Sequence, residues 1–223
     1  MTDVPTAALD NLSRETRRFP PSAEFAAQAN VDESIYAEAD ADRLAFWAKR
    51  AERLTWDTPF EQVLDWSDAP FAKWFVGGKL NVAVNCLDRH VAAGLGDRVA
   101  YFFEGEPGDT RTITYRELTE EVCQAANVLT DLGVKAGDRV AIYMPMIPEA
   151  VVAMLACARL GAPHTVVFGG FSADALATRI LDCDARVVIT ADGGWRKGAI
   201  TPLKPAVDEA LERCPDVRNV LVV

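Results

Sequence analysis

From Arg98 to the end of the chain, short apolar runs alternate with longer segments whose apolar residues recur every three or four positions. The short runs, such as DRVAIYMP (138–145) and HTVVF (164–168), are nearly continuous in apolar residues, which is typical of strands buried on both faces. The longer segments have the period of amphipathic helices. This alternation predicts an α/β fold, a mainly parallel sheet with helices on both faces.

The same patterns predict individual elements in this region. Thr114 and Glu117 have capping-box spacing, so a helix should begin after Thr114 and end at Gly133. Gly161 predicts the end of a second, buried helix. Strands are expected over 98–105, 111–115, 138–145, 164–168, 185–191 and 217–223, and further helices over 149–160, 172–181 and 201–213.

The first 95 residues have a different texture. Residues 1–30 mix Pro, Ser, Ala and charged residues without periodicity, which predicts a mobile tail. Helical spacing follows at 40–54 and 81–94, and the aromatic-rich stretch between them holds prolines and glycines that favour an ordered but irregular segment. We therefore expect three parts: the tail 1–30, an extension 31–95, and an α/β domain that begins at 96 and is still incomplete at 223.

Composition excludes several classes of protein. A net charge of −10 argues against non-specific binding to nucleic acid or to an anionic membrane, because both need a basic face. The five cysteines are scattered without a CxxC pair, which favours reduced thiols and a cytoplasmic location. The N-terminus has no apolar signal segment, and the longest apolar run, 150–158, is too short to span a bilayer.

The first candidate site is the turn in TVVFGGFSADAL (165–176). A strand, two glycines and a helix start meet here, so Gly169 and Gly170 allow close backbone approach and the helix N-terminus offers N–H donors to an anion. The spacing is neither a dinucleotide fingerprint nor a P-loop. From the residues alone, an ordinary tight turn with Ser172 as N-cap is the favoured explanation.

The second candidate site is ADGGWRKGAITPLK (191–204), which follows a strand at the sheet edge where open α/β folds bind ligands. It predicts a flexible loop that carries Trp195, Arg196, Lys197 and Gly198. The Arg196 guanidinium could bind a phosphate or stack on a base. An ordinary solvated basic loop is an equally good explanation of these residues.

The sequence gives less support to a hydrolase site or a metal site. The segment around Ser172 is similar to a hydrolase nucleophile elbow, but the chain has only two histidines and Asp174 replaces the last glycine of that motif. His90 and Cys86 share a helical face, yet two ligands do not make a metal site. No catalytic residue and no metal ligand are therefore assigned.

Several longer strings resemble a known family. WFVGGKLNVAVNCLDRH (74–90) resembles a signature of acetyl-CoA synthetases and their short-chain acyl-CoA synthetase relatives. TYREL (114–118) and ACARLGAPHTVVFGGFS (156–172) are similar to the first two core motifs of the adenylate-forming superfamily. The segment 34–75 also fits the N-terminal extension of these enzymes, and the resemblance runs from about residue 25 to the end of the chain.

The resemblance implies a chemistry and a set of site residues. Such enzymes use ATP, with Mg²⁺, to convert acetate to acetyl-adenylate, and coenzyme A then displaces AMP. By resemblance, Phe168, Gly169 and Gly170 pack against the 3′-phospho-ADP end of coenzyme A, and Arg196 binds its phosphate or stacks on adenine. The family commonly has a second basic residue where this chain has Ala199, and Lys197 is the alternative cation there.

The resemblance also implies an incomplete enzyme. The phosphate loop of the kind TSGSTGxPKG does not occur in the 223 residues, which end on an apolar strand. We therefore expect the N-terminal portion of an AMP-forming acetate–CoA ligase, inactive alone and partnered by the remaining C-terminal part. The alternatives are a fragment of a ligase for propionate or another short-chain acid, and a non-catalytic module that binds coenzyme A or a nucleotide.

Overall fold

The computed structural model describes residues 17–223, and these fall into two compact units that divide after Arg50. Part of the tail expected at 1–30 lies outside the described residues, and the described part holds a short helix, α2 (Ala23–Ala27). The helix expected over 40–54 has the wrong bounds. Helix α3 (Ser34–Ala41) and helix α4 (Arg43–Ala51) replace it, because Asp42 is extended and its carboxylate accepts a hydrogen bond from the Ala45 N–H at 2.9 Å.

The second unit begins with an aromatic cluster. The expectation that this stretch lacks regular elements is wrong, since β1 (Gln62–Asp65) and β2 (Lys73–Val76) form an antiparallel pair. The rings of Trp56, Phe60 and Phe75 pack with centroids 5.1–5.7 Å apart. A helical segment at 82–95 follows, close to the expected one, and contains two π-helical turns, η1 (Val84–Asp88) and η2 (Val91–Leu95).

A hairpin and a long helix connect this segment to the main sheet. Strands β3 (Val99–Glu104) and β4 (Thr110–Thr114) pair antiparallel in a two-stranded sheet of their own. Helix α5 (Tyr115–Asp131) then starts at the predicted capping box: the Thr114 hydroxyl accepts from the Glu117 N–H, and the Glu117 carboxylate accepts from the Thr114 N–H. The capping prediction is confirmed.

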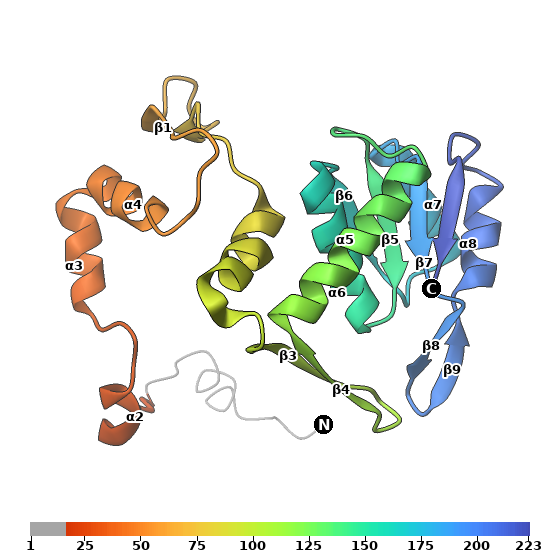
Figure 1. Ribbon diagram of the computed structural model, residues 1–223, viewed down its shortest axis with the longest axis horizontal. Helices are drawn as coiled ribbons and strands as arrows, with labels where there is room; N and C mark the ends of the chain where they lie inside the picture. Colours follow the sequence, from red (N-terminus) through yellow and green to blue (C-terminus); the bar gives the residue numbers. More distant parts are fainter. Residues whose placement is uncertain (1–16) are drawn as a thin grey trace, which may run out of the picture. The chain divides into compact units, whose positions relative to one another are not determined.

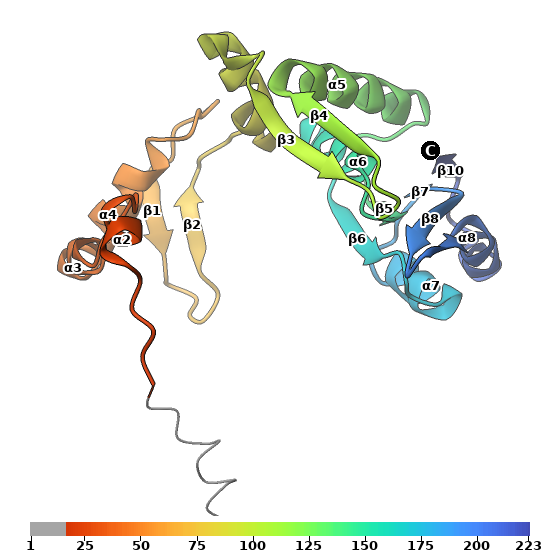
Figure 2. The same cartoon turned by 90° about the horizontal axis from the view of Figure 1, so that it is seen from below.

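The main sheet is parallel and has the strand order β10-β7-β5-β6. Its helices lie on both faces, with α5 and α6 on one side and α7 and α8 on the other (Figures 1 and 2). The α/β prediction is therefore confirmed. The bounds of these elements are β5 (Val140–Met144), α6 (Pro148–Leu160), β6 (His164–Phe168), α7 (Ala173–Asp182), β7 (Val187–Thr190), α8 (Lys204–Leu211) and β10 (Asn219–Val222).

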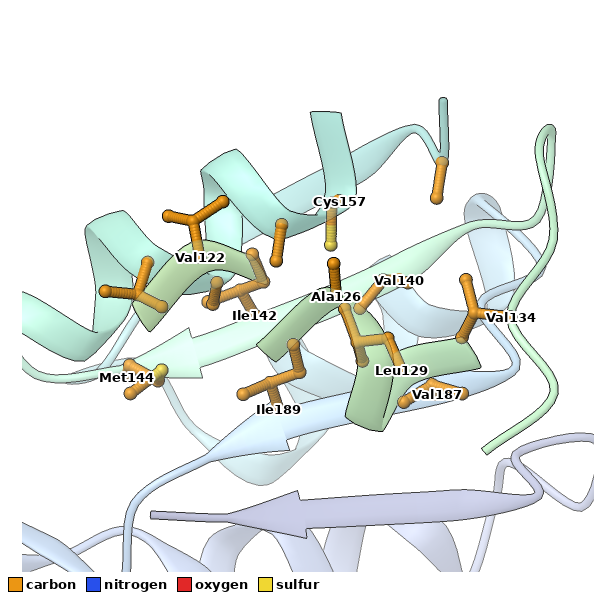
Figure 3. Packing of buried hydrophobic residues seen from close by; sticks show 14 of the residues in the cluster. Val122, Ala126, Leu129, Val134, Val140, Ile142, Met144, Cys157, Val187 and Ile189 are labelled. Atoms are coloured by element: carbon orange, nitrogen blue, oxygen red, sulfur yellow. The ribbon is translucent and has the colours of Figure 1, made fainter. Parts of the chain in front are cut away.

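Strand β5 lies at the centre of this arrangement, and its residues are buried on both faces. Ile142 faces a cluster that includes Leu129 of α5 and Cys157 of α6 (Figure 3). Tyr143 faces the opposite cluster, which includes Leu176 of α7. Within residues 17–223, no helix combines the length and apolar character needed to cross a membrane.

Candidate functional site

A cavity of about 420 Å³ lies at the carboxyl ends of β5 and β6. Open parallel sheets bind ligands at this edge. Three segments that are far apart in the sequence line the cavity: the β3–β4 turn, the residues that follow β5 and β6, and a hairpin that follows β7. The lining residues are Phe103, Glu104, Gly105, Glu106, Pro107, Asp109, Met144, Pro145, Met146, Ile147, Phe168, Gly169, Gly170, Gly193, Gly194, Trp195, Arg196, Thr201 and Leu203.

The Gly169–Gly170 turn is held tightly against the sheet. The Phe171 N–H donates to the Phe168 carbonyl at 3.0 Å, and the buried Tyr143 hydroxyl donates to the Phe171 carbonyl at 2.8 Å. Burial raises the pKa of Tyr143, which keeps this donor protonated. A β-carbon on Gly169 would lie 2.9 Å from the Met144 carbonyl oxygen, so the turn fits against β5 only with glycine there. The turn and the Ser172 N-cap are both confirmed.

The second glycine-rich segment, within 191–204, is a β-hairpin. The prediction of a flexible loop there is therefore wrong. Strands β8 (Gly193–Arg196) and β9 (Ala199–Pro202) pair antiparallel. The two connecting residues, Lys197 and Gly198, have φ of +54° and +76°, the pattern of a primed hairpin turn. Because β9 takes residues 199–202, helix α8 begins at Lys204 rather than at the expected Thr201.

The base of the hairpin is fixed by one residue. The Asp192 carboxylate accepts from the Gly193 N–H at 2.7 Å, and the Asp192 carbonyl accepts from the Leu203 N–H at 2.9 Å. At the same end, a β-carbon on Gly194 would lie 2.6 Å from the Pro145 ring. The hairpin therefore leaves the sheet directly beside the end of β5.

Arg196 extends from this hairpin over the first turn. Its guanidinium carbon lies 5.0 Å from the centre of the Phe168 ring, within cation–π range. A β-carbon on Gly170 would overlap the guanidinium, so the missing side chain at Gly170 provides its space. Within residues 17–223, Arg196 has no ion-pair partner. Its charge is therefore available to an anion in the cavity.

The structure brings together four of the six residues expected in the site. Phe168, Gly169, Gly170 and Arg196 line one cavity. Lys197 and Gly198 form the turn of the β8–β9 hairpin and do not line it.

Sequence reasoning missed the third wall, which includes Glu104, Glu106 and Asp109 of the β3–β4 hairpin. Strands were expected on either side of this turn, over 98–105 and 111–115, but no local pattern indicates which part of the fold the turn between them contacts. The Glu106 carboxylate accepts a hydrogen bond from the Gly198 N–H, so the two hairpin turns lie side by side (Figures 1 and 2).

The charges of the cavity are asymmetric. Carboxylates line the β3–β4 side, and the guanidinium of Arg196 lies on the β8 side. Helix α6 begins at Pro148, its first turn has no side-chain cap, and the preceding Met146 and Ile147 line the cavity. The positive end of the α6 dipole is therefore directed at this space. An anionic group is favoured near Arg196 and disfavoured near the β3–β4 turn.

A second cavity, of about 260 Å³, lies at the opposite, amino edge of the sheet. Arg139, Arg186 and Arg218 line it, each one residue before a strand. Two of these arginines have partners: Arg139 pairs with Asp184 at 3.1 Å and Arg186 with Asp216 at 3.2 Å.

Within residues 17–223, no cluster of three or more His, Cys, Asp or Glu side chains is arranged to hold a metal ion.

Comparison with known proteins supplies the family. A family described as acetyl-coenzyme A synthetase N-terminus matches residues 32–86. Among similar curated proteins, the acetyl-coenzyme A synthetase of Streptomyces avermitilis is 66% identical over 97% of this chain, and that of Mycolicibacterium smegmatis is 69% identical over 92%. The corresponding protein of Gemmatimonas aurantiaca is 57% identical over 96%.

The match covers only part of each relative. It spans 33% of the Streptomyces protein and 22% of the Mycolicibacterium protein, so the chain spans about a third or less of the length of the relatives it matches. The family described as AMP-binding enzyme matches residues 88–223, more than half of the chain and all of its parallel sheet. The chain belongs to the AMP-binding enzyme family.

Proposed function

We propose that this chain is the N-terminal portion of an ATP-dependent, AMP-forming acetate–CoA ligase and that its cavity receives the 3′-phospho-ADP end of coenzyme A. Residues 31–95 form the extension of the proposed ligase, and residues 96–223 form the first part of its AMP-binding domain. The free state of all five cysteines supports a cytoplasmic location for it.

One observation carries the proposal: an unpaired guanidinium lies above an aromatic ring at the edge of the cavity. Arg196 can pair with a phosphate of coenzyme A. Phe168 is 52% exposed, so its ring is accessible for contact with adenine. The asymmetry of charge supports a phosphate position at Arg196 rather than beside Glu104 and Asp109 of the β3–β4 hairpin.

Isothermal titration with coenzyme A tests this site. We expect micromolar binding by the unmodified chain and a loss of at least about tenfold in Arg196→Ala, because a charge-assisted contact to phosphate is removed. Arg213→Ala is the matched control, since Arg213 pairs with Asp174 and does not line the cavity. Absence of binding by the unmodified chain, or an equal loss in both variants, would refute the proposed site.

The same proposal predicts that the 223 residues alone have no ligase activity. Stabilising the charge that develops on ATP requires preorganised donors at the triphosphate. The chain contains no sequence of the kind TSGSTGxPKG, and its described residues offer no carboxylate cluster for Mg²⁺. We expect no AMP when acetate, ATP, Mg²⁺ and coenzyme A are added to the purified chain, and measurable turnover would contradict this assignment.

A further inference from the structure

We propose that Glu106 is a positioning residue for coenzyme A binding: its hydrogen bond to the Gly198 N–H holds the β8–β9 hairpin so that Arg196 stays over the cavity. This inference rests on the proposed function, since it assumes that Arg196 contacts the ligand. Glu106 itself is not assigned a contact with coenzyme A.

The β8–β9 hairpin needs an anchor at its turn. A hairpin of two short strands is only marginally stable by itself, and β8 and β9 pair with no other strand. Asp192 fixes its base, but Trp195, Arg196 and Ile200 are all exposed along its length. Without a further contact, the β8–β9 hairpin that carries the Arg196 guanidinium would be held only at its base.

Glu106 provides the attachment at the other end. It lies in the tight β3–β4 turn, in which the Gly105 N–H donates to the Asp109 carbonyl at 2.7 Å and the Gly108 N–H donates to the Gly105 carbonyl at 2.9 Å. Its carboxylate accepts from the Gly198 N–H, 92 residues further along the chain. A rigid turn thus holds the turn of the hairpin through one charge-assisted hydrogen bond.

The contact has a direct consequence for Arg196. Lys197 and Gly198 are the only residues between Arg196 and the start of β9. Movement of the Gly198 N–H away from Glu106 would therefore displace Arg196 from the Phe168 ring, 5.0 Å away. The carboxylate has a cost, since it adds negative charge to a cavity that receives a phosphate. A residue that only repelled the ligand would weaken binding, whereas a positioning residue strengthens it.

Three variants separate positioning from charge. Glu106→Ala removes the acceptor, Glu106→Gln keeps an acceptor oxygen without the charge, and Glu104→Ala removes one charge from the same cavity wall. The Glu104 carboxylate makes no hydrogen bond or ion pair within the described residues, which makes this variant the matched control. The readouts are the Kd for coenzyme A by calorimetry and the exchange rate of the Gly198 amide proton by NMR.

We expect Glu106→Ala to weaken coenzyme A binding about fivefold and to speed exchange of the Gly198 amide, with the melting temperature unchanged. Glu106→Gln should stay within about twofold of the unmodified chain, since it keeps an acceptor at Gly198. Glu104→Ala should not weaken binding, since it removes a negative charge from the cavity wall and leaves the Gly198 contact intact. Binding by Glu106→Ala that equals or exceeds that of the unmodified chain would overturn the inference. So would a loss in Glu106→Gln or Glu104→Ala as large as that in Glu106→Ala.

The same experiment keeps the two proposals apart. If the unmodified chain does not bind coenzyme A, the proposed coenzyme A site fails, whatever the variants do. If the unmodified chain binds and Glu106→Ala binds equally well, only the positioning role fails. Exchange of the Gly198 amide is measured without ligand, so unchanged exchange in Glu106→Ala refutes the anchoring contact independently of either binding result.

Discussion

The amino edge of the parallel sheet, where its strands begin, and the carboxyl edge, where they end, both carry arginines. The arginines at the two edges make different contacts. At the amino edge, Arg139 donates through Nε to the Cys183 carbonyl at the end of α7, at 2.8 Å, and pairs with Asp184. Helices in this fold end at that edge, so arginines there complement the negative ends of helix dipoles. At the carboxyl edge, Arg196 faces an open cavity and has no carboxylate partner among the residues that the structure describes.

The comparison teaches that a cavity lined with cations is not by itself an anion site. At the amino edge, Arg139 and Arg186 are each paired with a carboxylate at the surface, Asp184 and Asp216. At the carboxyl edge, helix starts add to the positive charge, and glycines leave room for a ligand. Arg218 at the amino edge also has no ion-pair partner within residues 17–223. What distinguishes the candidate site is that its unpaired guanidinium lies over an aromatic ring, beside glycines and a helix start.

The largest expected effect tests whether the two edges belong to one cooperative body. Ile142 is fully buried in β5, the strand that runs between the edges. Ile142→Ala should lower the free energy of unfolding by about 3 kcal/mol, because it leaves a cavity in the core. Urea unfolding measures this loss, and amide exchange should quicken at both edges. Faster exchange at one edge alone would show that the edges are independent.

A second change should affect the carboxyl edge alone. In Gly170→Val, the new side chain would take the space of the Arg196 guanidinium and crowd Phe168, whose Cε1 atom lies 2.8 Å from the position of the β-carbon. Both groups are ends of movable side chains, so we expect little change in melting temperature. Coenzyme A binding should fall at least about tenfold by calorimetry. Unchanged affinity would mean that the ligand does not use the space beside Gly170.

The smallest expected effect concerns the amino edge. Arg139→Ala removes the contacts to the Cys183 carbonyl and to Asp184, both at a partly exposed position. It should lower the free energy of unfolding by about 1 kcal/mol or less. Coenzyme A affinity should be unaffected, because Arg139 lines only the opposite cavity. A weakening of binding as large as that expected for Gly170→Val would remove the distinction between the two edges.

The sequence predicted the body of the fold well because the signals there are local. Nearly continuous apolar strands, the capping box at Thr114 and the left-handed Gly161 each act within a few residues. The paired strands β1, β2, β8 and β9 were missed because each is only four residues long and includes glycine, proline or charge, whereas β7 and β10, of the same length, belong to nearly continuous apolar runs. A period of two is hard to recognise over four residues that include glycine, proline or charge.

The candidate site could be predicted only in part. The Gly169–Gly170 turn was predicted from a local glycine pattern, and the roles of this turn and of Arg196 were predicted from the family resemblance. The contact between Glu106 and Gly198 joins residues 92 positions apart and depends on where two hairpins lie, which no local pattern contains. For the same reason, the sequence could not distinguish Lys197, which forms the hairpin turn, from Arg196, which lines the cavity.

The most direct test of the account is to add coenzyme A to the isotopically labelled chain and map the amide resonances that move. The account predicts shifts in the Gly169–Gly170 turn and along β8–β9, with Arg139, Arg186 and Arg218 unmoved. Shifts concentrated at those three arginines, or no shifts at millimolar ligand, would contradict the assignment of the carboxyl edge as the binding site.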